Sequence, residues 1–360
     1  MPMGRTPHGH RIADGTRGWT RRDGHEGTGT EPSRRPAAGS VPGVKILVPG
    51  NVPFDSAPQV DAGDVVARYV MRDPIPDEHV DADVLVTWAS PGRVLADAAR
   101  RLTRLRWIQT LNAGPDAVLA AGFAPDVVVT SGRGLHDATV AEHTLALVLA
   151  SVRRLDRTLV SQHAHTWDRT LGKEQASADA GRTFTLDGAR VTLWGFGSIA
   201  LRTAPLLAAF GAHVTGVAST AGTRGGFRVV DESALRALLP QTDVLVSLLP
   251  ATPATHHVLD ADLLALLPPH ARFVNVGRGA TVDEAALVAA LRSGTLAGAA
   301  LDVTETEPLP ADSPLWDAPN LILTPHVAGG RPQDAAAFLT EQVRAFKSSG
   351  AAGLRNLVER

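Results

Sequence analysis

Three side chains that could together move a proton lie in the C-terminal third of the chain: Arg278, Glu307 and His326. They stand in the phrases Asn-Val-Gly-Arg-Gly, Glu-Thr-Glu-Pro and Thr-Pro-His-Val-Ala-Gly-Gly, respectively. A cation, a carboxylate and an imidazole are the groups needed to transfer a proton to or from a carbonyl that lies beside a carboxylate. These residues are therefore the first candidates for a catalytic site.

A glycine turn upstream predicts a dinucleotide site. The pattern Gly195-x-Gly197-x-x-Ala200 follows a strand-like run and opens a helix-like one. Gly195 permits the tight turn, Gly197 lets the backbone approach a pyrophosphate, and the small Ala200 lets the helix pack closely. The amides of Ser198 and Ile199 would face the phosphate charge. Such turns also occur for structural reasons alone, but this context together with the three candidates predicts an oxidoreductase.

The residue that would hold the adenosine ribose bears on the choice of cofactor. An acidic side chain is expected about 20 residues after the turn, at the end of the next strand, and Ala218 occupies that place. Ser219, Thr220 and Arg224 follow. No carboxylate stands there in the sequence to repel a 2′-phosphate, so the cofactor is NAD or NADP, with NADP plausible. The alternative for Arg224 is a solvated loop charge.

Composition narrows the class of protein. The 360 residues predict about two domains, and an apolar fraction of 44% supplies two cores. A net charge of −2 argues against a nucleic-acid-binding protein. No run approaches the ~18 apolar residues that span a bilayer. The chain has no cysteine, which excludes disulfides, cysteine zinc sites and thiol nucleophiles and is compatible with the expected cytoplasmic location.

The first 40 residues differ from the rest. Arg, Gly, Thr, Pro and His dominate them, and Ile12 is the only branched aliphatic residue. This composition predicts a disordered extension over 1–40, because it cannot bury enough apolar surface to offset its ordering entropy. It lacks the apolar segment of a signal peptide, its acidic residues argue against a transit peptide, and it could lie upstream of the natural start.

Apolar runs alternate with helical stretches along the remainder, which predicts an α/β fold with parallel sheets. A long amphipathic helix is expected at 139–155, a loop at 162–182 with Trp167 as its apolar anchor, and a C-terminal helix at 332–348. The expected strands lie at 45–50, 83–87, 107–111, 127–130, 190–194, 213–218, 243–249, 272–276, 299–302 and 321–324.

From residue 44 to about 346 the chain resembles the D-isomer-specific 2-hydroxyacid dehydrogenase family. Besides the phrases above, the resemblance rests on those at 112–116, 140–143, 249–255 and 314–316. It implies two Rossmann-like, doubly wound parallel-sheet domains with the active site in the cleft between them. The dinucleotide-binding domain at 137–327 would be inserted into a substrate domain made of 41–136 and 328–360. A homodimer is expected through the 139–155 region.

The resemblance also implies roles for residues. Arg278 would pair with the substrate carboxylate, which suits its planar fork. His326 would give a proton to the carbonyl oxygen as hydride arrives, and Glu307 would hold the imidazole and favour its protonated form. Backbone amides at Ala113 and Gly114 would receive the substrate carboxylate.

Cofactor contacts carry over in the same way, and Asp302 matches the residue that binds the nicotinamide amide. The expected cofactor-binding residues are Gly195, Gly197, Ser198, Ile199, Ser219, Thr220, Pro250, Thr255, Val276, Asp302 and Gly329. No metal is expected. His143 is expected to pack or bond within its own helix, and His256, His257 and His270 to be loop or helix-surface residues.

The expected function is hydride transfer between NAD(P) and a small 2-oxo or 2-hydroxy acid of the glyoxylate or hydroxypyruvate type. A Tyr-x-x-x-Lys mechanism fails because the only tyrosine, Tyr69, has Asp73 four residues on. A formate-oxidising enzyme of the family is disfavoured, since it has glutamine at the place of Glu307. The alternative is an NAD(H)-sensing, corepressor-like binding protein of the same fold. These sequence motifs do not identify the substrate, although Trp88, Trp167 and Trp316 could line its pocket.

Overall fold

The structure is a computed structural model that describes residues 43–50, 58–177 and 184–359. The extension predicted at 1–40 lies outside the described residues.

The first sheet has five parallel strands in the order β2-β1-β3-β4-β5. Apart from the edge strand β2, its strands are largely buried and mostly apolar, as expected where helices cover both faces of a parallel sheet. The elements are β1 (Lys45–Pro49), β2 (Val65–Tyr69), β3 (Val84–Thr87), α1 (Gly92–Arg101), β4 (Trp107–Thr110), α2 (Asp116–Leu119) and β5 (Val128–Thr130).

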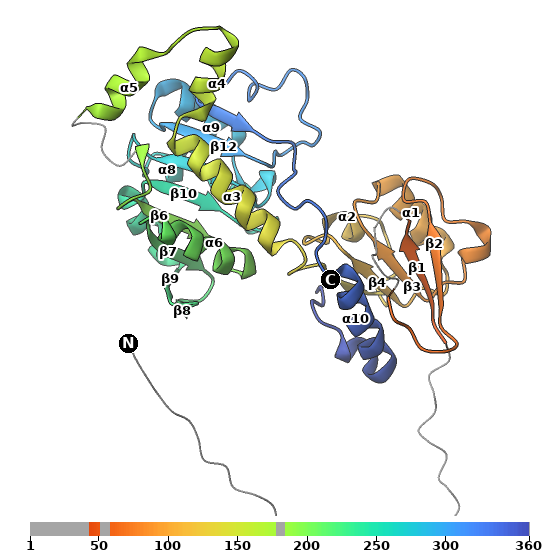
Figure 1. Cartoon of the computed structure of the whole chain (residues 1–360). Coiled ribbons are helices and arrows are strands. Elements are labelled where there is room, and N and C mark those ends of the chain that lie inside the picture. Colours follow the sequence, from red (N-terminus) through yellow and green to blue (C-terminus); the bar gives the residue numbers. More distant parts are fainter. Residues whose placement is uncertain (1–42, 51–57, 178–183, 360) are drawn as a thin grey trace, which may run out of the picture. The chain divides into compact units, whose positions relative to one another are not determined.

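The C-terminal helix α10 (Ala335–Ser349) packs on this first sheet, although all strands of the second sheet lie between them in the sequence (Figure 1). Phe338 and Val343 belong to the same core cluster as the strands, and the rings of Phe346 and Trp107 lie 5.2 Å apart. The chain therefore returns to its first sheet, and a helix close to the predicted 332–348 is confirmed.

The second sheet has eight strands in the order β13-β12-β11-β10-β6-β7-β9-β8, all parallel except the β8–β9 hairpin. The chain runs outward from β6 in one direction and restarts at β10 in the other, so the sheet has a switch point between β6 and β10. The strands are β6 (Arg190–Trp194), β7 (His213–Ala218), β8 (Gly222–Arg224), β9 (Phe227–Asp231), β10 (Val244–Ser247), β11 (Arg272–Asn275), β12 (Gly298–Leu301) and β13 (Leu321–Leu323). Its helices are α3 (Asp137–Val152), α6 (Ser198–Ala209), α7 (Leu235–Leu238), α8 (Ala261–Leu264) and α9 (Glu284–Ser293).

Helix α3 forms much of the helical cover on one face of this sheet. Val140, Leu147, Val148 and Val152 lie buried in one core cluster with strand and α6 side chains. The predicted helix at 139–155 is thus present, beginning two residues earlier and ending at Val152. Both sheets bear out the predicted α/β class with parallel sheets.

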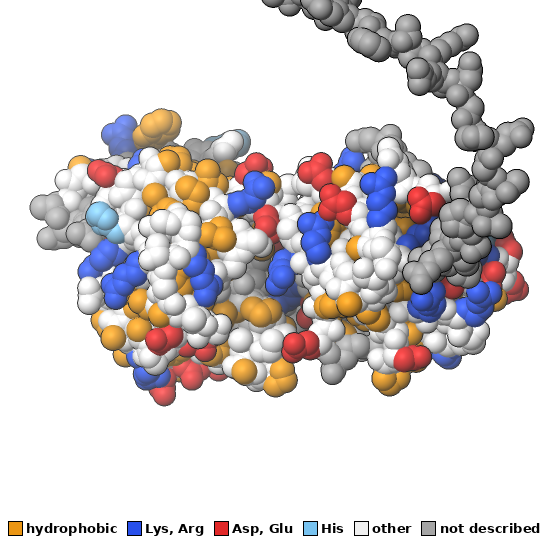
Figure 2. All heavy atoms as spheres, turned by 90° about the horizontal axis from the view of Figure 1, so that it is seen from below, with side chains coloured by type: hydrophobic (Ala, Val, Ile, Leu, Met, Phe, Trp, Pro, Cys, Tyr) orange, Lys and Arg blue, Asp and Glu red, His pale blue; other side chains and the backbone are white. Residues whose placement is uncertain are grey.

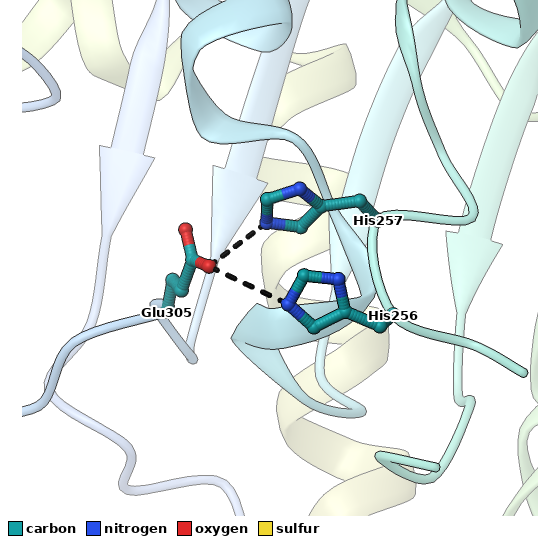
Figure 3. A group of neighbouring side chains, drawn as sticks. All are labelled: His256, His257 and Glu305. Carbon is teal, nitrogen blue, oxygen red and sulfur yellow. Dashed lines mark hydrogen bonds and ion pairs between the residues drawn. The ribbon is translucent and has the colours of Figure 1, made fainter. Parts of the chain in front are cut away.

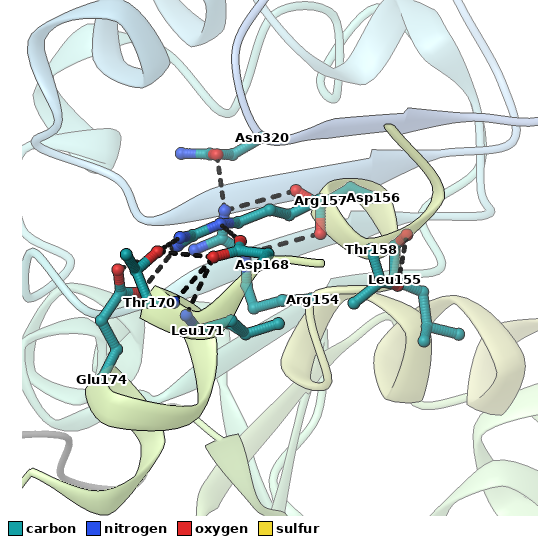
Figure 4. Close-up of polar contacts among 10 residues, drawn as sticks. All are labelled: Arg154, Leu155, Asp156, Arg157, Thr158, Asp168, Thr170, Leu171, Glu174 and Asn320. Carbon is teal, nitrogen blue, oxygen red and sulfur yellow. Dashed lines mark hydrogen bonds and ion pairs between the residues drawn. The ribbon is translucent and has the colours of Figure 1, made fainter. Parts of the chain in front are cut away.

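The loop predicted at 162–182 is wrong in large part. Helices α4 (Leu155–His163) and α5 (Arg169–Ala176) occupy much of its described part, and residues 178–182 lie outside the described residues. Asp168 caps α5 by accepting from the backbone amides of Thr170 and Leu171, and Arg157 donates to Asp168 and to Glu174 (Figure 4). Helix α5 is stabilised by a cap and by ion pairs, and these interactions produce no periodic pattern of apolar residues in the sequence. The helix was therefore not predicted. Trp167, the predicted anchor, is 87% exposed.

Among the described residues, no helix is long and apolar enough to cross a membrane. On the face drawn in Figure 2, basic and acidic side chains are interspersed rather than gathered by sign.

Candidate active site

The glycine turn follows β6 at the switch point and has the shape that a phosphate requires. Gly195 has φ +97°, and a Cβ atom there would lie 2.9 Å from the backbone of Leu248. A Cβ at Gly197 would meet nothing within 4 Å, so the space before the helix is open. Helix α6 begins at Ser198 with no side chain capping its first turn. The open N-terminus and the close backbone fit a pyrophosphate group.

The segment after β7 brings a cation to this turn. Arg224 donates from Nη1 to the carbonyl of Phe196, at 2.8 Å, and from Nη2 to that of Thr220, at 2.9 Å. It is half-buried between the glycine turn and the exposed Ser219 and Thr220. The solvated-loop alternative for Arg224 is therefore wrong.

The expectation that no carboxylate lies near Ala218 also needs correction. The register of β7 and β9 pairs Ala218 with Asp231. Asp231 is engaged at the start of a short helix, where it accepts from the backbone amide of Ser233 at 3.0 Å and from its hydroxyl. The pairing arises from the β8–β9 hairpin, which could not be placed from the sequence.

The other expected cofactor residues follow the carboxyl ends of neighbouring strands, where parallel sheets bind ligands. Pro250 and Thr255 follow β10, and the hydroxyl of Thr255 donates to the carbonyl of Pro250 at 2.7 Å. Val276 follows β11, and Gly329 follows β13.

Asp302, at the end of β12, holds the segment that carries His326. Its Oδ1 accepts from the hydroxyl of Thr324 at 2.6 Å and from the amide of Val327 at 3.0 Å, and its Oδ2 accepts from the amide of Ala328 at 2.9 Å. The side chain is nearly inaccessible. Asp302 thus positions this loop.

His143 takes part in the same network, and the expectation that it bonds within its own helix is wrong. Its Nε2 lies 3.0 Å from the hydroxyl of Thr324 and 3.3 Å from Oδ1 of Asp302. Helix α3 is thereby tied to the end of β13.

His326 and Glu307 form a charged pair. Nδ1 of His326 donates to Oε2 of Glu307 at 2.6 Å, and Oε1 of Glu307 accepts from the amide of Thr304 at 3.1 Å. The hydrogen bond that His326 donates to Glu307 raises the pKa of His326 above its ordinary value, although partial burial opposes this. Burial alone would raise the pKa of Glu307, but the hydrogen bonds from His326 and Thr304 bring it below its ordinary value.

Arg278 lies close enough for its charge to act on both members of the pair. Its positive charge opposes protonation of His326 and favours ionisation of Glu307. Its Nε and Nη2 donate to Oδ2 of Asp116 at 3.3 and 3.2 Å. The sequence did not single out Asp116, although it closes the quoted phrase at 112–116.

The expected substrate loop meets Arg278 directly. A Cβ atom at Gly114 would lie 1.9 Å from Nη2 of Arg278 and 2.4 Å from Oδ2 of Asp116. The structure thus brings Arg278 together with the backbone at Gly114. Beside this loop, His136 lies 2.7 Å from the carbonyl of Leu111 through Nε2 and 2.8 Å from that of Gly329 through Nδ1.

A pocket of about 610 Å³ opens beside His326, Glu307 and Asp302. Its apolar wall, which the sequence did not predict apart from Trp316, includes Leu309 and Leu323. Arg278, Ala113 and Gly114 lie outside its lining. Of the three tryptophans considered, Trp316 lines it, Trp88 packs against the core of the first sheet, and Trp167 is exposed.

A glycine turn at a switch point and an imidazole–carboxylate pair beside an arginine define an NAD(P)-dependent oxidoreductase. A family model for the D-isomer specific 2-hydroxyacid dehydrogenase NAD binding domain matches residues 145–328. Glyoxylate/hydroxypyruvate reductase A of Salmonella heidelberg (strain SL476) is 34% identical over 274 residues, covering 73% of this chain and 82% of its own length. The chain belongs to the D-isomer specific 2-hydroxyacid dehydrogenase family.

Solved structures support the same family assignment. A family member from Aeromonas salmonicida superposes with a TM-score of 0.71 at 30% identity, covering 89% of this chain and 99% of its own. An NADPH-dependent glyoxylate/hydroxypyruvate reductase from Sinorhizobium meliloti, in complex with NADP and sulfate, has a TM-score of 0.71 at 28% identity. The match covers 88% of this chain and 98% of the reductase chain. The chain is an NAD(P)-dependent 2-hydroxyacid dehydrogenase that acts on CH–OH donors.

Proposed function

We propose that the chain interconverts a small 2-oxo acid of the glyoxylate or hydroxypyruvate type and its 2-hydroxy acid, with His326 as the acid–base. The observation that carries the proposal is the 2.6 Å hydrogen bond between His326 and Glu307, within reach of the charge of Arg278. Two relatives with this substrate class in their names, from Salmonella and Sinorhizobium, support the choice.

Each residue has a defined task in the proposed reaction. Arg278 pairs with the substrate carboxylate, assisted by the amides of Ala113 and Gly114. The bound nicotinamide supplies or accepts the hydride. His326 donates a proton from Nε2, the ring nitrogen that Glu307 leaves free, to the carbonyl oxygen, and takes it back in the oxidation. Glu307 stabilises the imidazolium. The pairing of Asp116 with Arg278 supports the first step, because one carboxylate oxygen already accepts from two of the guanidinium N–H groups.

We propose NADP as the preferred cofactor. Arg224, Ser219 and Thr220 stand where a 2′-phosphate would lie, and Ala218 leaves no carboxylate at the end of β7 itself. Asp231 opposes this preference by its charge, although its carboxylate is engaged by Ser233. Gly195, Gly197, Ser198 and Ile199 would hold the pyrophosphate. The nicotinamide half would lie against Pro250, Thr255, Val276, Asp302 and Gly329.

The domain boundaries are proposed as 41–136 with 328–360 for the substrate domain and 137–327 for the dinucleotide-binding domain. The division follows the two sheets and the packing of α10 on the first. A homodimer is also proposed. The apolar side chains of α3 are largely used in its own core, so the exposed Leu155, Leu159 and Val160 are the better contact candidates in this region.

The test is absorbance at 340 nm with purified protein, NADH or NADPH, and a panel of small 2-oxo acids. Oxidation of NADPH by glyoxylate or hydroxypyruvate, lost in His326→Ala while cofactor binding persists, is the expected result. Binding of both cofactors without turnover of any acid would overturn the proposal in favour of a dinucleotide sensor.

A further inference from the structure

His256, His257 and Glu305 form a group of potential metal ligands that the proposed reaction does not use. Nε2 of His257 lies 2.8 Å from Oε1 of Glu305, and Nε2 of His256 lies 3.9 Å from the same oxygen (Figure 3). The three donor atoms all lie within 4.8 Å of one another.

Backbone geometry directs the two adjacent histidines toward one point. Side chains of consecutive residues in extended chain point apart, but His257 has φ +48° and its imidazole stacks on that of His256, with ring centroids 4.1 Å apart. This left-handed conformation costs a non-glycine residue about 1 kcal/mol or more. The amide of His257 donates to the carbonyl of Ala280 at 2.9 Å, which fixes the turn.

The carboxylate is also held from its backbone. The amide of Glu305 donates to Oε1 of Glu284 at 2.6 Å, so the first residue of α9 anchors the segment that carries the ligand. The exposed fractions of the ligand side chains are 58% for His256, 37% for His257 and 39% for Glu305, which leaves the group open to ions from solvent.

The donor spacing suits zinc. Tetrahedral Zn²⁺ with bonds of about 2.0–2.2 Å places its ligand atoms roughly 3.3–3.6 Å apart. The observed separations of 2.8 and 3.9 Å to Glu305 lie on either side of that range, so small side-chain rotations would admit the ion. Two imidazoles and one carboxylate select a transition metal over Mg²⁺ or Ca²⁺, which require oxygen ligands.

We propose that His256, His257 and Glu305 bind one Zn²⁺ ion, with water as the fourth ligand. The sequence alone predicted no metal, because Glu305 lies 48 residues after His257 along the chain. The ion would join the 252–257 segment, which follows β10, to the 304–307 segment, which carries Glu307. The inference does not depend on the substrate or on turnover.

The test is zinc binding to the full chain, measured by competition with a chromophoric zinc indicator and by the rise in melting temperature with added Zn²⁺. We expect one ion per chain, and affinity lowered by more than about tenfold in His256→Ala, His257→Ala and Glu305→Gln. Co²⁺ in place of Zn²⁺ should show the visible bands of a tetrahedral ion. Thermal melting without metal shows whether each variant still folds.

Two sets of controls separate this site from other histidines. His163→Ala and His270→Ala remove imidazoles bonded elsewhere, to Leu159 and Asp243, and should leave the affinity unchanged. Substituting His8, His10 and His25 together removes ligands that the N-terminal segment could supply. Wild type that binds zinc no more tightly than the His256→Ala/His257→Ala variant would overturn the proposal and leave the group as a hydrogen-bonded His–Glu pair.

Discussion

The guanidinium of Arg278 lies against Gly114, so closely that a single methyl group could not stand between them. A Cβ atom at Gly114 would be 1.9 Å from Nη2, a distance that no pair of non-bonded atoms tolerates. Residue 114 precedes α2 beside the first sheet, whereas Arg278 follows β11 of the second. Parts of the chain 164 residues apart therefore meet where the substrate carboxylate is proposed to bind.

We expect Gly114→Ala to lower kcat/KM by roughly 100-fold, because displacing Arg278 by about 1 Å spoils substrate orientation. Folding should be little affected, since the atom nearest the new methyl group is the end of a flexible side chain. Gly92→Ala is the matched control, because a Cβ there meets nothing within 4 Å. Steady-state kinetics and thermal melting report the two effects. An unchanged kcat/KM would show that Arg278 does not need its present position.

Arg278→Lys should raise KM for the 2-oxo acid and lower kcat, with a combined loss of roughly 100-fold or more in kcat/KM. Lysine keeps the charge but lacks the planar fork that pairs with both oxygens of a carboxylate. Arg100→Lys, in a surface ion pair with Asp97, is the control and should have no effect on kinetics. Equal kinetics for Arg278→Lys and wild type would remove the arginine from the proposed substrate contact.

The rates of 2-oxo acid reduction and of 2-hydroxy acid oxidation should depend on pH in opposite ways. Reduction needs protonated His326, so its rate falls as pH rises through the raised pKa of this group, whereas oxidation rises over the same range. Glu307→Gln removes the charge and should move both limbs to lower pH. Glu305→Gln, assayed with a chelator present, should move neither. If the pH profiles of Glu307→Gln do not shift from those of the wild type, Glu307 does not favour the protonated form of His326.

The same pair makes stability depend on pH. The raised pKa of His326 gives a contribution that is complete below the unfolded pKa and is lost as pH rises through the folded one. The lowered pKa of Glu307 gives a contribution that is present above its unfolded pKa and is lost on acidification. The melting temperature of Glu307→Gln should therefore lie below that of the wild type mainly between the unfolded pKa of Glu307 and the folded pKa of His326.

Arg224→Ala should raise KM for NADPH by about tenfold or more and leave KM for NADH nearly unchanged, because only NADPH carries the 2′-phosphate. Arg236→Ala, on the surface of α7, is the control. If both cofactors weaken equally, Arg224 acts through its bonds to Phe196 and Thr220 and does not select the cofactor.

The single tyrosine offers a test of the first sheet. Burial raises the pKa of Tyr69 to about 12, and its hydroxyl donates to the carbonyl of Val86 at 2.8 Å. Absorbance of the phenolate should thus appear near pH 12 in the folded protein and near pH 10 in denaturant. Stability from this group is present below about pH 10 and is lost towards pH 12, by roughly 3 kcal/mol in total. A native midpoint near 10 would show that Tyr69 is accessible.

Sequence patterns predicted the buried parallel strands, because each is a short continuous apolar run, such as β10 and β11. The more exposed strands β2, β8 and β9 were not predicted. The phrases around Gly195, Arg278 and His326 were predictable for a related reason: they follow the apolar runs, and carboxyl ends of parallel strands meet at one edge. Asp116, the partner of Arg278, was not predicted, because it lies in a segment far from Arg278 along the chain.

Features that depend on non-local contacts could not be found in the same way. Helix α5 relies on the Asp168 cap and on Arg157, not on an apolar stripe. Asp231 reaches Ala218 only because β8 and β9 form a hairpin. The partner of His143 lies 181 residues away along the chain.

The position of His136 has a mechanical consequence. One imidazole touches the carbonyl at the end of β4 and the carbonyl of Gly329, close to the two places where the backbone passes between the first and the second sheet. The ring belongs to the passage from β5 to α3 and contacts the passage from β13 to α10 at Gly329. We therefore expect the two passages to turn together as one pivot and not as two separate tethers.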